Sequence, residues 1–387
     1  MPLDVFKVSE SEAIYVQEAD LRAATQAVFE KMGVPEEDAA LATDVLVMAD
    51  MRGVDSHGVS NMLRSYMLSF REGRYNPRPD WKVVRERAST ATIESDRGLG
   101  IIVAPKAMEI AIAKAKQTGI GVVAIRNGGH MGMASYHAMM ALEHDMIGIA
   151  MTAVGTAVLP TFGAEGRLGT NPIAVAAPAK NMHPFVLDIA TSMVAANKMQ
   201  LAKRLGAMLP AGMVADSEGT PTDAPGELPE GYKNIPIGGT RELGSHKGYG
   251  LAMVVEIMCT ILSGGMPMSL PDSGRQATHH LAAYDIDAFT DVDEFKEIMD
   301  KWLETLEATP TAPGHERVLT PGLEEEEAEA ARRVAAAATG LPGGRCRRWP
   351  DGWGRCAAWR GSPRRRWRAS RRRRAWRWNR SWLRRPR

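Results

Sequence analysis

Apolar residues recur every three or four positions through the first 75 residues, which is the spacing of amphipathic helices. This pattern predicts a helix over Gln17–Lys31 that ends at Gly33, and a second helix that begins after Pro35. A third helix is predicted from its apolar face, which consists of Leu63, Tyr66, Met67 and Phe70. The segment MRGVDSHGVSN then forms a joint between helices.

After this helical region, short apolar runs alternate with helical patterns. The predicted strands are Ala91–Glu94, Gly121–Ile125, Ile147–Thr152, Ile173–Ala177, Phe185–Ile189 and His279–Phe289. The predicted helices are Val103–Gln117, Ala134–Glu143, Met193–Leu205, Gly248–Leu262 and Asp291–Leu306. The stretch 210–239 is rich in Pro, Gly and Asp, and we expect a loop too polar and too broken to form core. Strands mixed with helices predict an α/β or α+β fold with a central sheet.

Three common fingerprints are absent from the sequence. No G-x-G-x-x-G follows a predicted strand and no G-x-x-x-x-G-K-[ST] occurs, so a doubly wound dinucleotide fold is not supported. The lack of G-x-S-x-G argues against a serine hydrolase. Any chemistry must therefore come from less common groups of residues.

The net charge of +2 conceals two segments of opposite character. Residues 345–387 hold 18 Arg, no Lys and one acid, Asp351, so they carry +17 and leave −15 for residues 1–344. Seven of the nine Trp also lie in those last 43 residues. Self-repulsion and the lack of any helix or strand periodicity predict an open, disordered tail over 341–387.

This Arg/Trp tail has two interpretations. Arg interleaved with Trp suits phosphate contacts and stacking, as in an arm that binds nucleic acid or a membrane surface. A frameshift in a GC-rich gene also yields Arg, Ala, Gly, Pro and Trp, and we favour it because nothing upstream resembles a nucleic-acid-binding protein. We place the break between Arg333 and Gly344, where the acidic helical stretch LEEEEAEAARRVAAAA gives way.

Composition narrows the class of protein. The chain is 44% hydrophobic and 24% charged, as is ordinary for a protein with a buried core. No apolar run approaches the about 18 residues needed to cross a bilayer, and the N-terminus lacks a basic start followed by an apolar stretch. Cys259, Cys346 and Cys356 form neither a disulfide framework nor a zinc-like cluster. We therefore expect a cytoplasmic protein with no metal site and no membrane partner.

Two segments carry a histidine at a joint between predicted elements. The DSHG segment around His57 is either a helix-capping turn or the place of a proton-transfer group, because histidine titrates near neutral pH. The NGGHMG segment around His130 follows a predicted strand and precedes a predicted helix. It is either a plain turn or a place where glycines and helix amides approach an anionic ligand.

Four other polar segments have less specific signals. Asp188 ends the apolar run FVLDIATS, where a buried carboxylate needs a partner, so it either caps the next helix or orients a histidine. Lys247 opens an apolar helix in the segment HKGYG, which the helix dipole disfavours unless the Lys faces a bound anion. The GTNP segment at 169–172 and the PGHE segment at 313–316 read as short polar turns.

Taken together and in this order, these segments resemble the type-2 malate/L-lactate dehydrogenase family. The matching pieces are RGVDSHGVS, RNGGHMGMASYHA, RLGTNPIAVAAP, FVLDIATS, GSHKGYGLAMVVEI and PGHER. The family also includes ureidoglycolate, sulfolactate and diketogulonate dehydrogenases and cyclic imino-acid reductases. The resemblance covers roughly residues 15–335 and excludes the Arg/Trp tail.

The resemblance implies an α/β fold in which a non-Rossmann mixed sheet is flanked by helices, with a helical N-terminal domain. It also implies an NAD or NADP cofactor and a homodimer whose active sites lie between domains and can draw on the partner subunit. We accordingly divide the chain into a helical N-terminal domain that contributes to the active site (1–78), a mixed α/β region that binds cofactor and substrate (79–310), a segment that returns to the N-terminal domain (311–340), and the tail (341–387).

The resemblance further implies roles for individual residues. His57 matches the proton donor and acceptor for the substrate C2 oxygen, Asp188 its orienting partner, and His130 a second active-site histidine that some members use as the base. Ser56 matches a substrate-binding position. Cofactor contacts are expected from His130, Thr170, Asn171, Asp188, Ile189, Ala190, Thr191, Ser192, Lys247, Gly248, Gly314, His315 and Glu316.

One position departs from the family pattern. Many members carry an Arg four residues after the SHG histidine, where it clamps the substrate carboxylate in a bidentate fork. This chain has Asn61 there, which gives up a charge-assisted hydrogen bond of about 1.5–3 kcal/mol. Arg64, one helical turn further on, is the candidate replacement, so we assign Ser56, Asn61 and Arg64 to substrate binding.

We therefore interpret the chain as an NAD(P)-dependent oxidoreductase. It transfers a hydride between nicotinamide and C2 of a 2-hydroxy or 2-oxo acid of the malate or lactate type. One alternative is a ureidoglycolate or cyclic imino-acid (ketimine) oxidoreductase of the same family. The other, from a different class, is a nucleic-acid-binding protein that uses the basic tail.

Overall fold

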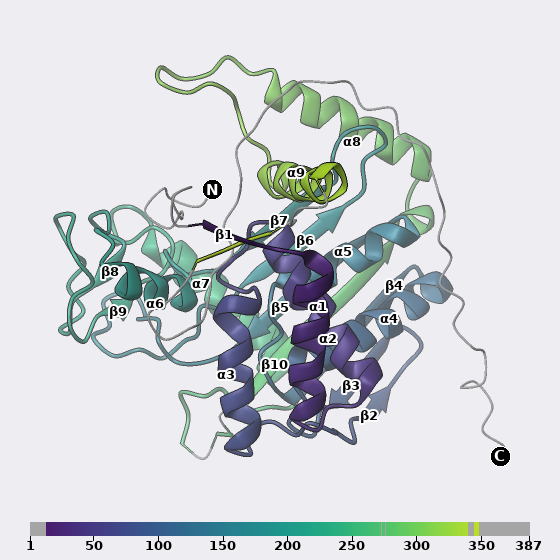
Figure 1. Cartoon of the computed structure of the whole chain (residues 1–387), viewed down its shortest axis with the longest axis horizontal. Coiled ribbons are helices and arrows are strands. Elements are labelled where there is room, and N and C mark those ends of the chain that lie inside the picture. The colour runs from purple at the N-terminus through teal and green to yellow at the C-terminus, as the bar shows by residue number, and fades with distance from the viewer. Residues whose placement is uncertain (1–12, 272, 275, 340–343, 348–387) are drawn as a thin grey trace.

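A seven-stranded sheet runs through the centre of the molecule (Figure 1). The computed structural model describes residues 13–271, 273–274, 276–339 and 344–347 of the chain. In spatial order, the strands of the sheet are β2 (Lys82–Glu86), β3 (Thr90–Glu94), β4 (Ile120–Gly128), β10 (Ala277–Asp285), β5 (Met146–Ala153), β6 (Ile173–Ala177) and β7 (Phe185–Ile189).

The sheet is mixed, as expected from the resemblance. β3 and β4 pair in parallel and are joined by the helix α4 (Gly100–Thr118), whereas all other neighbours pair antiparallel. The late strand β10 inserts between β4 and β5, and its first seven residues are buried. A strand more than 120 residues away in sequence thus completes the middle of the sheet, which is why a sequence pattern alone could not place it.

Helices cover both faces of the sheet. α4 packs on β4 and β10, and α5 (Ala134–Met139) packs on β5 and β6, over one face. On β5, Ala150 belongs to this core, while its neighbour Met151 packs with Val255 and Cys259 on the other face, as strand alternation requires. That second face is covered by α7 (Ser245–Glu256) and the π-helical turn Ile257–Ile261.

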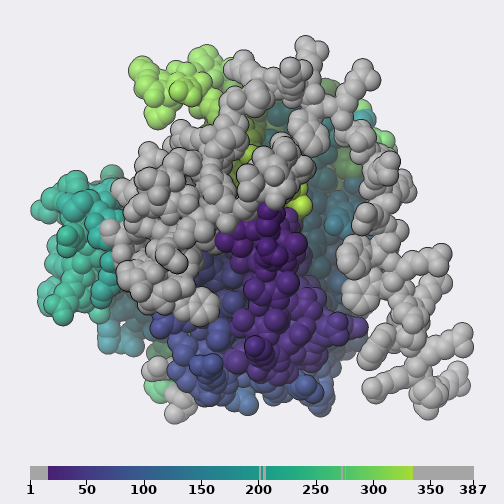
Figure 2. Space-filling model, in the orientation of Figure 1, coloured from purple at the N-terminus to yellow at the C-terminus, as the bar shows by residue number. Residues whose placement is uncertain are grey.

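The N-terminal helices form a further layer outside α4. They are α1 (Glu18–Lys31), α2 (Glu36–Met51) and α3 (Val59–Arg71). Their buried side chains, including Phe29, Leu46 and Tyr66, share one apolar cluster with Ile101 and Ile102 of α4. Figure 2 shows this layer in purple and blue on the viewed face of the molecule. The predicted helical N-terminal region and its Gly33 stop are confirmed.

A small lobe lies beside the sheet and contains α6 (Ala196–Leu205), β8 (Val214–Ala215) and β9 (Lys233–Asn234) (Figure 1). Our expectation that 210–239 is too polar to form core is wrong. Val214 packs with Met199 and Leu209 in a cluster of its own, and Ala215 and Ile235 form another with Leu159. The few apolar residues of this stretch are spaced irregularly, so they leave no periodic signal.

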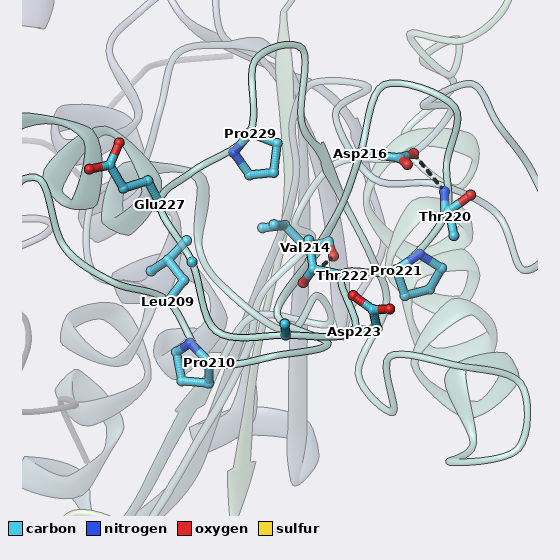
Figure 3. Close-up of a pocket in the computed structure, with 12 residues that line it drawn as sticks. Leu209, Pro210, Val214, Asp216, Thr220, Pro221, Thr222, Asp223, Glu227 and Pro229 are labelled. Carbon is cyan, nitrogen blue, oxygen red and sulfur yellow. Dashed lines mark hydrogen bonds between the residues drawn. The ribbon is translucent and has the colours of Figure 1, made fainter.

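The same lobe has a hollow of about 480 Å³ (Figure 3). Its wall includes Pro210, Pro221, Asp223 and Pro229, and the residues that line it include none of the predicted site residues. The carboxylate of Asp216 is occupied at its edge, since Oδ1 accepts from the backbone N–H groups of both Glu218 and Thr220.

The C-terminal part of the described chain returns to the N-terminal layer. α8 (Val292–Glu307) is followed by an exposed connection and by α9 (Leu323–Thr339), which packs against α2. β1 (Ala13–Val16) pairs antiparallel with β11 (Gly344–Arg347). The rest of the predicted Arg/Trp tail lies outside the described residues. In the part of the chain that is described, no helix combines the length and hydropathy needed to cross a bilayer.

Candidate active site

The turn between α2 and α3 carries His57 and is fixed from below by a buried carboxylate. Asp50, near the end of α2, accepts a hydrogen bond from the backbone N–H of Val59, the first residue of α3, at 2.9 Å. Gly58 is required in this turn because a Cβ there would lie 1.7 Å from Oδ1 of Asp50. The capping interpretation of this segment is thus partly correct, with Asp50 rather than Asp55 or Ser56 as the capping side chain.

The His57 ring is held in place by two neighbouring side chains. Its Nδ1 lies 2.9 Å from Oγ of Ser56, and its ring stacks on His130 with centroids 5.6 Å apart and planes 10° from parallel. The surrounding protein desolvates the half-buried ring and, with the nearby His130 and Lys198, lowers the pKa of His57 to about 3. The imidazole is therefore neutral at physiological pH and able to accept a proton.

His130 sits in the loop between β4 and α5, as predicted. Its Nδ1 lies 2.7 Å from the hydroxyl of Tyr66 and receives the backbone N–H of Gly132 at 3.2 Å. A backbone N–H only donates, so Nδ1 is unprotonated and the ring proton of neutral His130 is assigned to Nε2. Desolvation lowers the pKa of His130 to about 4, which keeps the ring neutral.

Asp188 lies at the end of β7, where the sequence placed it. Its Oδ2 accepts a hydrogen bond from the backbone N–H of Ser135, in the first turn of α5, at 2.7 Å. Although the residue is exposed, desolvation by the surrounding protein raises its pKa, against the lowering effect of Ser135. The charges of Glu325 and Lys198 also act on it.

The two histidines come together, whereas the His57–Asp188 dyad does not form a direct contact. The His57 ring hydrogen-bonds Ser56 and stacks on His130. The Asp188 carboxylate instead hydrogen-bonds the backbone N–H of Ser135. Lys198 of α6 acts electrostatically on both His57 and Asp188. The orienting role of Asp188 therefore stays a prediction.

The predicted substrate-binding residues lie in the turn before α3 and in the first turns of that helix. Asn61 donates from Nδ2 to the carbonyl oxygen of Ser56 at 2.8 Å, so part of its side chain closes the turn that carries His57. Ser56 is buried, and its hydroxyl faces His57. Arg64 is exposed on the same helix. The side chain at position 61 thus supports the turn instead of supplying a positive charge.

The segment that follows Asp188 forms an open edge of the site. Ile189 is 36% exposed and Met193 is 40% exposed, whereas Thr191 and Ser192 between them are buried. Thr191 donates through Oγ1 to the carbonyl oxygens of Thr170 and Asn171, both at 3.1 Å. Exposed apolar side chains on the segment after Asp188 suit the ring of a nicotinamide, so the residues present fit such a cofactor.

Asn171 is fully buried and already engaged. Its Nδ2 donates to the carbonyl oxygen of Ala252 at 3.0 Å and to Glu256 at 3.2 Å, which ties the start of β6 to α7. Any contact of Asn171 with a cofactor would therefore come from its backbone. Its neighbour Thr170 is half-buried, with its carbonyl oxygen held by Thr191.

The other predicted cofactor residues lie in two places. Lys247 is exposed in the first turn of α7, and Gly248 is buried where a Cβ would lie 2.4 Å from the backbone nitrogen of Ile237. Gly314, His315 and Glu316 are exposed on the connection between α8 and α9. That connection ends beside β7, where the N–H of Val186 donates to Pro321.

Sequence reasoning missed three side chains that shape the site. Tyr66 was assigned only to the apolar face of α3, yet its hydroxyl contacts His130. Tyr75 contacts the backbone N–H of His130 through its hydroxyl at 3.3 Å. Lys198 lies on α6, in a stretch without a motif signal. Tertiary packing alone brings these residues to the histidines.

The described residues form no candidate metal site. Over the described residues, no group of three or more His, Cys, Asp or Glu side chains is arranged to hold a metal ion. Cys259 is a buried free thiol. The site consists of neutral imidazoles, one carboxylate and one lysine, which is a set suited to moving protons.

Comparison with known proteins identifies the family. A family model described as malate/L-lactate dehydrogenase matches residues 16–339, which is most of the chain and includes every predicted site residue. The chain belongs to this family. Its members' shared chemistry makes the protein an oxidoreductase that acts on hydroxy acids with a nicotinamide cofactor.

Individual members of the malate/L-lactate dehydrogenase family are similar across most of their length. Malate dehydrogenase of Pyrococcus horikoshii is 44% identical over 300 residues, which cover 76% of this chain and 83% of the relative. L-sulfolactate dehydrogenase of Methanocaldococcus jannaschii is 39% identical over 313 residues, covering 79% and 88%. The solved structure of the Pyrococcus horikoshii OT3 malate dehydrogenase superposes with a TM-score of 0.77 at 40% identity, covering 85% of this chain and 91% of that chain.

Proposed function

We propose that the protein oxidises a malate-like 2-hydroxy acid to the 2-oxo acid, and catalyses the reverse reaction, with NAD or NADP. The observation that carries this proposal is the stacked pair of neutral imidazoles, His57 and His130. The bound nicotinamide would supply the hydride acceptor or donor. Similarity to malate and sulfolactate dehydrogenases supports a dicarboxylate-like substrate.

In this proposal His57 handles the proton. With its Nδ1–H donated to Oγ of Ser56, the lone pair of Nε2 is free to take the C2 hydroxyl proton as the hydride leaves C2. His130 then donates a hydrogen bond from Nε2 to the same substrate oxygen, because its Nδ1 is occupied by Gly132 and Tyr66. The negative charge of the Asp188 carboxylate would stabilise the imidazolium that forms on His57.

The substrate carboxylate needs a cation that position 61 does not provide. Arg64 is the candidate from the sequence, and Lys198 is a second because its charge reaches His57. We favour a contribution from both to a substrate with two anionic groups. Replacing Arg64 or Lys198 by Met should then raise KM for a dicarboxylate-like substrate more than for lactate.

We propose that the cofactor lies along 188–193 and reaches Lys247, Gly248 and the 314–316 connection. NAD and NADP are to be measured separately. The cytoplasmic location also stays a prediction, and the alternative of nucleic-acid binding concerns a tail of which residues 348–387 lie outside the described part of the chain.

We further propose a homodimer in which α7 and the turn after it form the contact. Their exposed apolar side chains are Leu251, Met253, Val254, Ile257, Ile261 and Leu262, each 41–56% exposed. Such a continuous apolar stripe is unusual on a free surface and typical of an interface. Sedimentation of Val254→Glu should show loss of the dimer, whereas a dimer retained by this variant would exclude the surface.

The function is tested by consumption of NADH and NADPH on a variant that lacks residues 345–387. The 2-oxo acids of malate, sulfolactate and lactate form one arm, and a cyclic imine carboxylate forms another. We expect the fastest turnover with the dicarboxylate-like 2-oxo acids. Turnover of the cyclic imine alone would replace the proposal with the imino-acid reductase, and no turnover with any arm would contradict it.

A further inference from the structure

Two histidines behind the site hydrogen-bond the backbone on either side of His130. His279 of β10 contacts the carbonyl oxygen of Gly129 through Nε2 at 3.0 Å. His137 of α5 contacts the carbonyl oxygen of Met131 through Nε2 at 2.8 Å. Both side chains are fully buried, with no exposed surface. The backbone atoms that flank His130 are therefore held from two separate elements, a central strand and a helix.

The protonation states of these two histidines follow from their partners. A carbonyl oxygen only accepts, so Nε2 carries the proton in both rings. Burial lowers the pKa of His279 to about 3 and that of His137 to about 4, so both rings are neutral and each Nδ1 is unprotonated. Nδ1 of His279 lies 2.8 Å from Oγ1 of Thr152, whose one hydroxyl proton is shared between this nitrogen and the carbonyl oxygen of Thr278 at 3.1 Å.

These contacts fix the plane of the His130 ring. With the carbonyl groups of Gly129 and Met131 held, the peptide units on both sides of His130 cannot rotate freely. The N–H of Gly132 then points at Nδ1 of His130, and the hydroxyl of Tyr66 approaches the same atom. The ring lies nearly parallel to His57 as a result.

Both imidazoles also have a structural role, because each pairs a buried carbonyl group. Apolar residues of similar size would fill the same space, although each would leave a buried carbonyl unpaired at a cost of about 1–3 kcal/mol. His280, the next residue on β10, offers the comparison. It is also buried, at 4% exposed, and hydrogen-bonds the backbone of Met258, but strand alternation turns it to the opposite face, away from the His130 loop. Its Nδ1, like that of His137, has no partner among the described atoms.

We propose that His137 and His279 are positioning residues that hold His130 with its proton on Nε2, so that His130 presents a hydrogen-bond donor and not a base to the substrate oxygen. The part that concerns the substrate rests on the proposed function. The part that concerns the ring proton does not, because it follows from contacts within the chain.

The test uses the full chain labelled with ¹⁵N-histidine. Ring nitrogen shifts report which nitrogen of each histidine is protonated, and His130→Gln assigns the His130 signals. His137→Leu and His279→Leu remove one donor each, whereas His137→Gln and His279→Gln keep an N–H near the position of Nε2. His280→Leu is the matched control, because it removes a buried imidazole from the same strand without touching the His130 loop.

We expect the unaltered protein to show His130 protonated on Nε2 alone. Each Leu variant should shift His130 toward a mixture of tautomers and lower kcat at least tenfold, with KM changed less than threefold. The Gln variants should stay within about threefold of the original kcat, and His280→Leu should alter neither readout. These effects separate positioning of a group in the transition state from general loss of stability.

Unchanged His130 signals in both Leu variants, or equal changes in His280→Leu, would overturn the proposal. If a Leu variant fails to fold, Thr152→Val serves instead, since it removes the hydroxyl beside Nδ1 of His279, together with its bond to the carbonyl oxygen of Thr278, and leaves the His279 ring in place. A smaller shift of His130 in the same direction is expected there, and no shift overturns the proposal. Because the tautomer readout needs no substrate, correct tautomer shifts in a protein with no dehydrogenase activity would contradict the proposed function alone.

Discussion

At the residue scale, the two site histidines differ in what their environment permits. His57 contacts a serine hydroxyl, which donates or accepts, so its ring is able to change protonation during a reaction. His130 faces a backbone N–H, which would oppose a proton on Nδ1. The same burial that lowers both pKa values keeps both rings neutral at rest. Under the proposed mechanism, the base and the hydrogen-bond donor are thus two residues of the same type.

The first prediction concerns His57. His57→Ala should lower kcat by at least about 10²-fold, the lower end for loss of general acid–base catalysis, while binding of the reduced cofactor survives. Turnover is followed by NAD(P)H absorbance and cofactor binding by its fluorescence. His144→Ala, at an exposed histidine far along the chain, is the control and should leave both unchanged. Near-original turnover in His57→Ala would remove His57 from the mechanism.

The second prediction concerns Asp50 under the His57 turn. Burial, followed by the charge of Asp55, raises the pKa of Asp50 to about 8, against the lowering effects of Val59 N–H and Arg332. The folded state then holds a proton that the unfolded state releases near its ordinary pKa of 3.8. This group therefore lowers the free energy of unfolding as pH rises from about 4 to about 8.

Asp50→Asn removes that titration and keeps an oxygen that can accept from Val59. The free energy of unfolding of Asp50→Asn, minus that of the unaltered protein, should increase progressively from pH 5 to pH 8. The variant thus becomes the relatively more stable of the two as pH rises. Urea unfolding at several pH values measures this difference. Parallel curves for the two proteins across that range would show that Asp50 is not protonated in the fold.

The residues that the sequence could identify are those that carry a motif. His57, His130 and Asp188 stand in recognisable segments, and the structure places the two histidines together. Tyr66 and Lys198 carry no such signal, because a tyrosine on an apolar helix face and a lysine on a short helix are ordinary. Their roles depend on distances between elements that no local pattern encodes.

At the scale of elements, periodicity predicted most helices and strands where one face is buried. β3 and β5 alternate buried and less buried positions, and both were predicted. β2 was missed because all five of its side chains are exposed, so no alternation exists to detect. The helix predicted over Ala134–Glu143 is α-helical only to Met139 and continues as a 3-10 turn to His144.

The third prediction concerns the docking of α8 on the hairpin between β6 and β7. Asp300 of α8 accepts hydrogen bonds from the backbone N–H groups of Lys180, Asn181 and Met182 at 2.8–3.1 Å. Although desolvation raises its pKa, these donors lower it overall. The stability that Asp300 contributes is therefore present above its unfolded pKa and lost as pH falls through the lower folded value.

Asp300→Ala should reduce the free energy of unfolding at pH 7 by about 1.5–3 kcal/mol, the range for hydrogen bonds to a charged group. Asp300→Asn keeps one acceptor oxygen and should lose less. Urea unfolding at pH 7 and pH 3 gives both values, and the deficit of Asp300→Ala should shrink at pH 3. A deficit that does not depend on pH would show that the carboxylate charge plays no part in this contact.

At the scale of the whole molecule, the site draws on segments from nearly the full length of the described chain. His57 comes from the N-terminal layer, His130 from the loop after β4, Asp188 from β7, and Lys198 from the small lobe. α9 then links two of these parts, since Glu325 acts on Asp188 while Arg52 beside the His57 turn pairs with the same helix. Activity should therefore depend on how α9 is docked.

The last prediction tests that dependence through Arg52, which is 4% exposed and lies at the end of α2. Its Nη1 contacts Glu326 at 3.1 Å and Glu329 at 2.9 Å. Breaking a buried pair costs about 3–5 kcal/mol and an exposed pair at most about 1 kcal/mol. Because Glu326 is 46% exposed, the loss in free energy of unfolding caused by Arg52→Ala should fall between these limits, at about 2 kcal/mol.

Arg317→Ala is the matched control, because Arg317 pairs with Glu327 of the same helix while both side chains are about half exposed. Arg317→Ala should lower the free energy of unfolding by less than about 1 kcal/mol. Arg52→Ala should also lower kcat, since the turn that carries His57 loses its tie to α9, whereas Arg317→Ala should leave kcat unchanged. Urea unfolding and turnover are measured on both variants. Equal losses of kcat in the two would mean that α9 stabilises the fold without positioning the site.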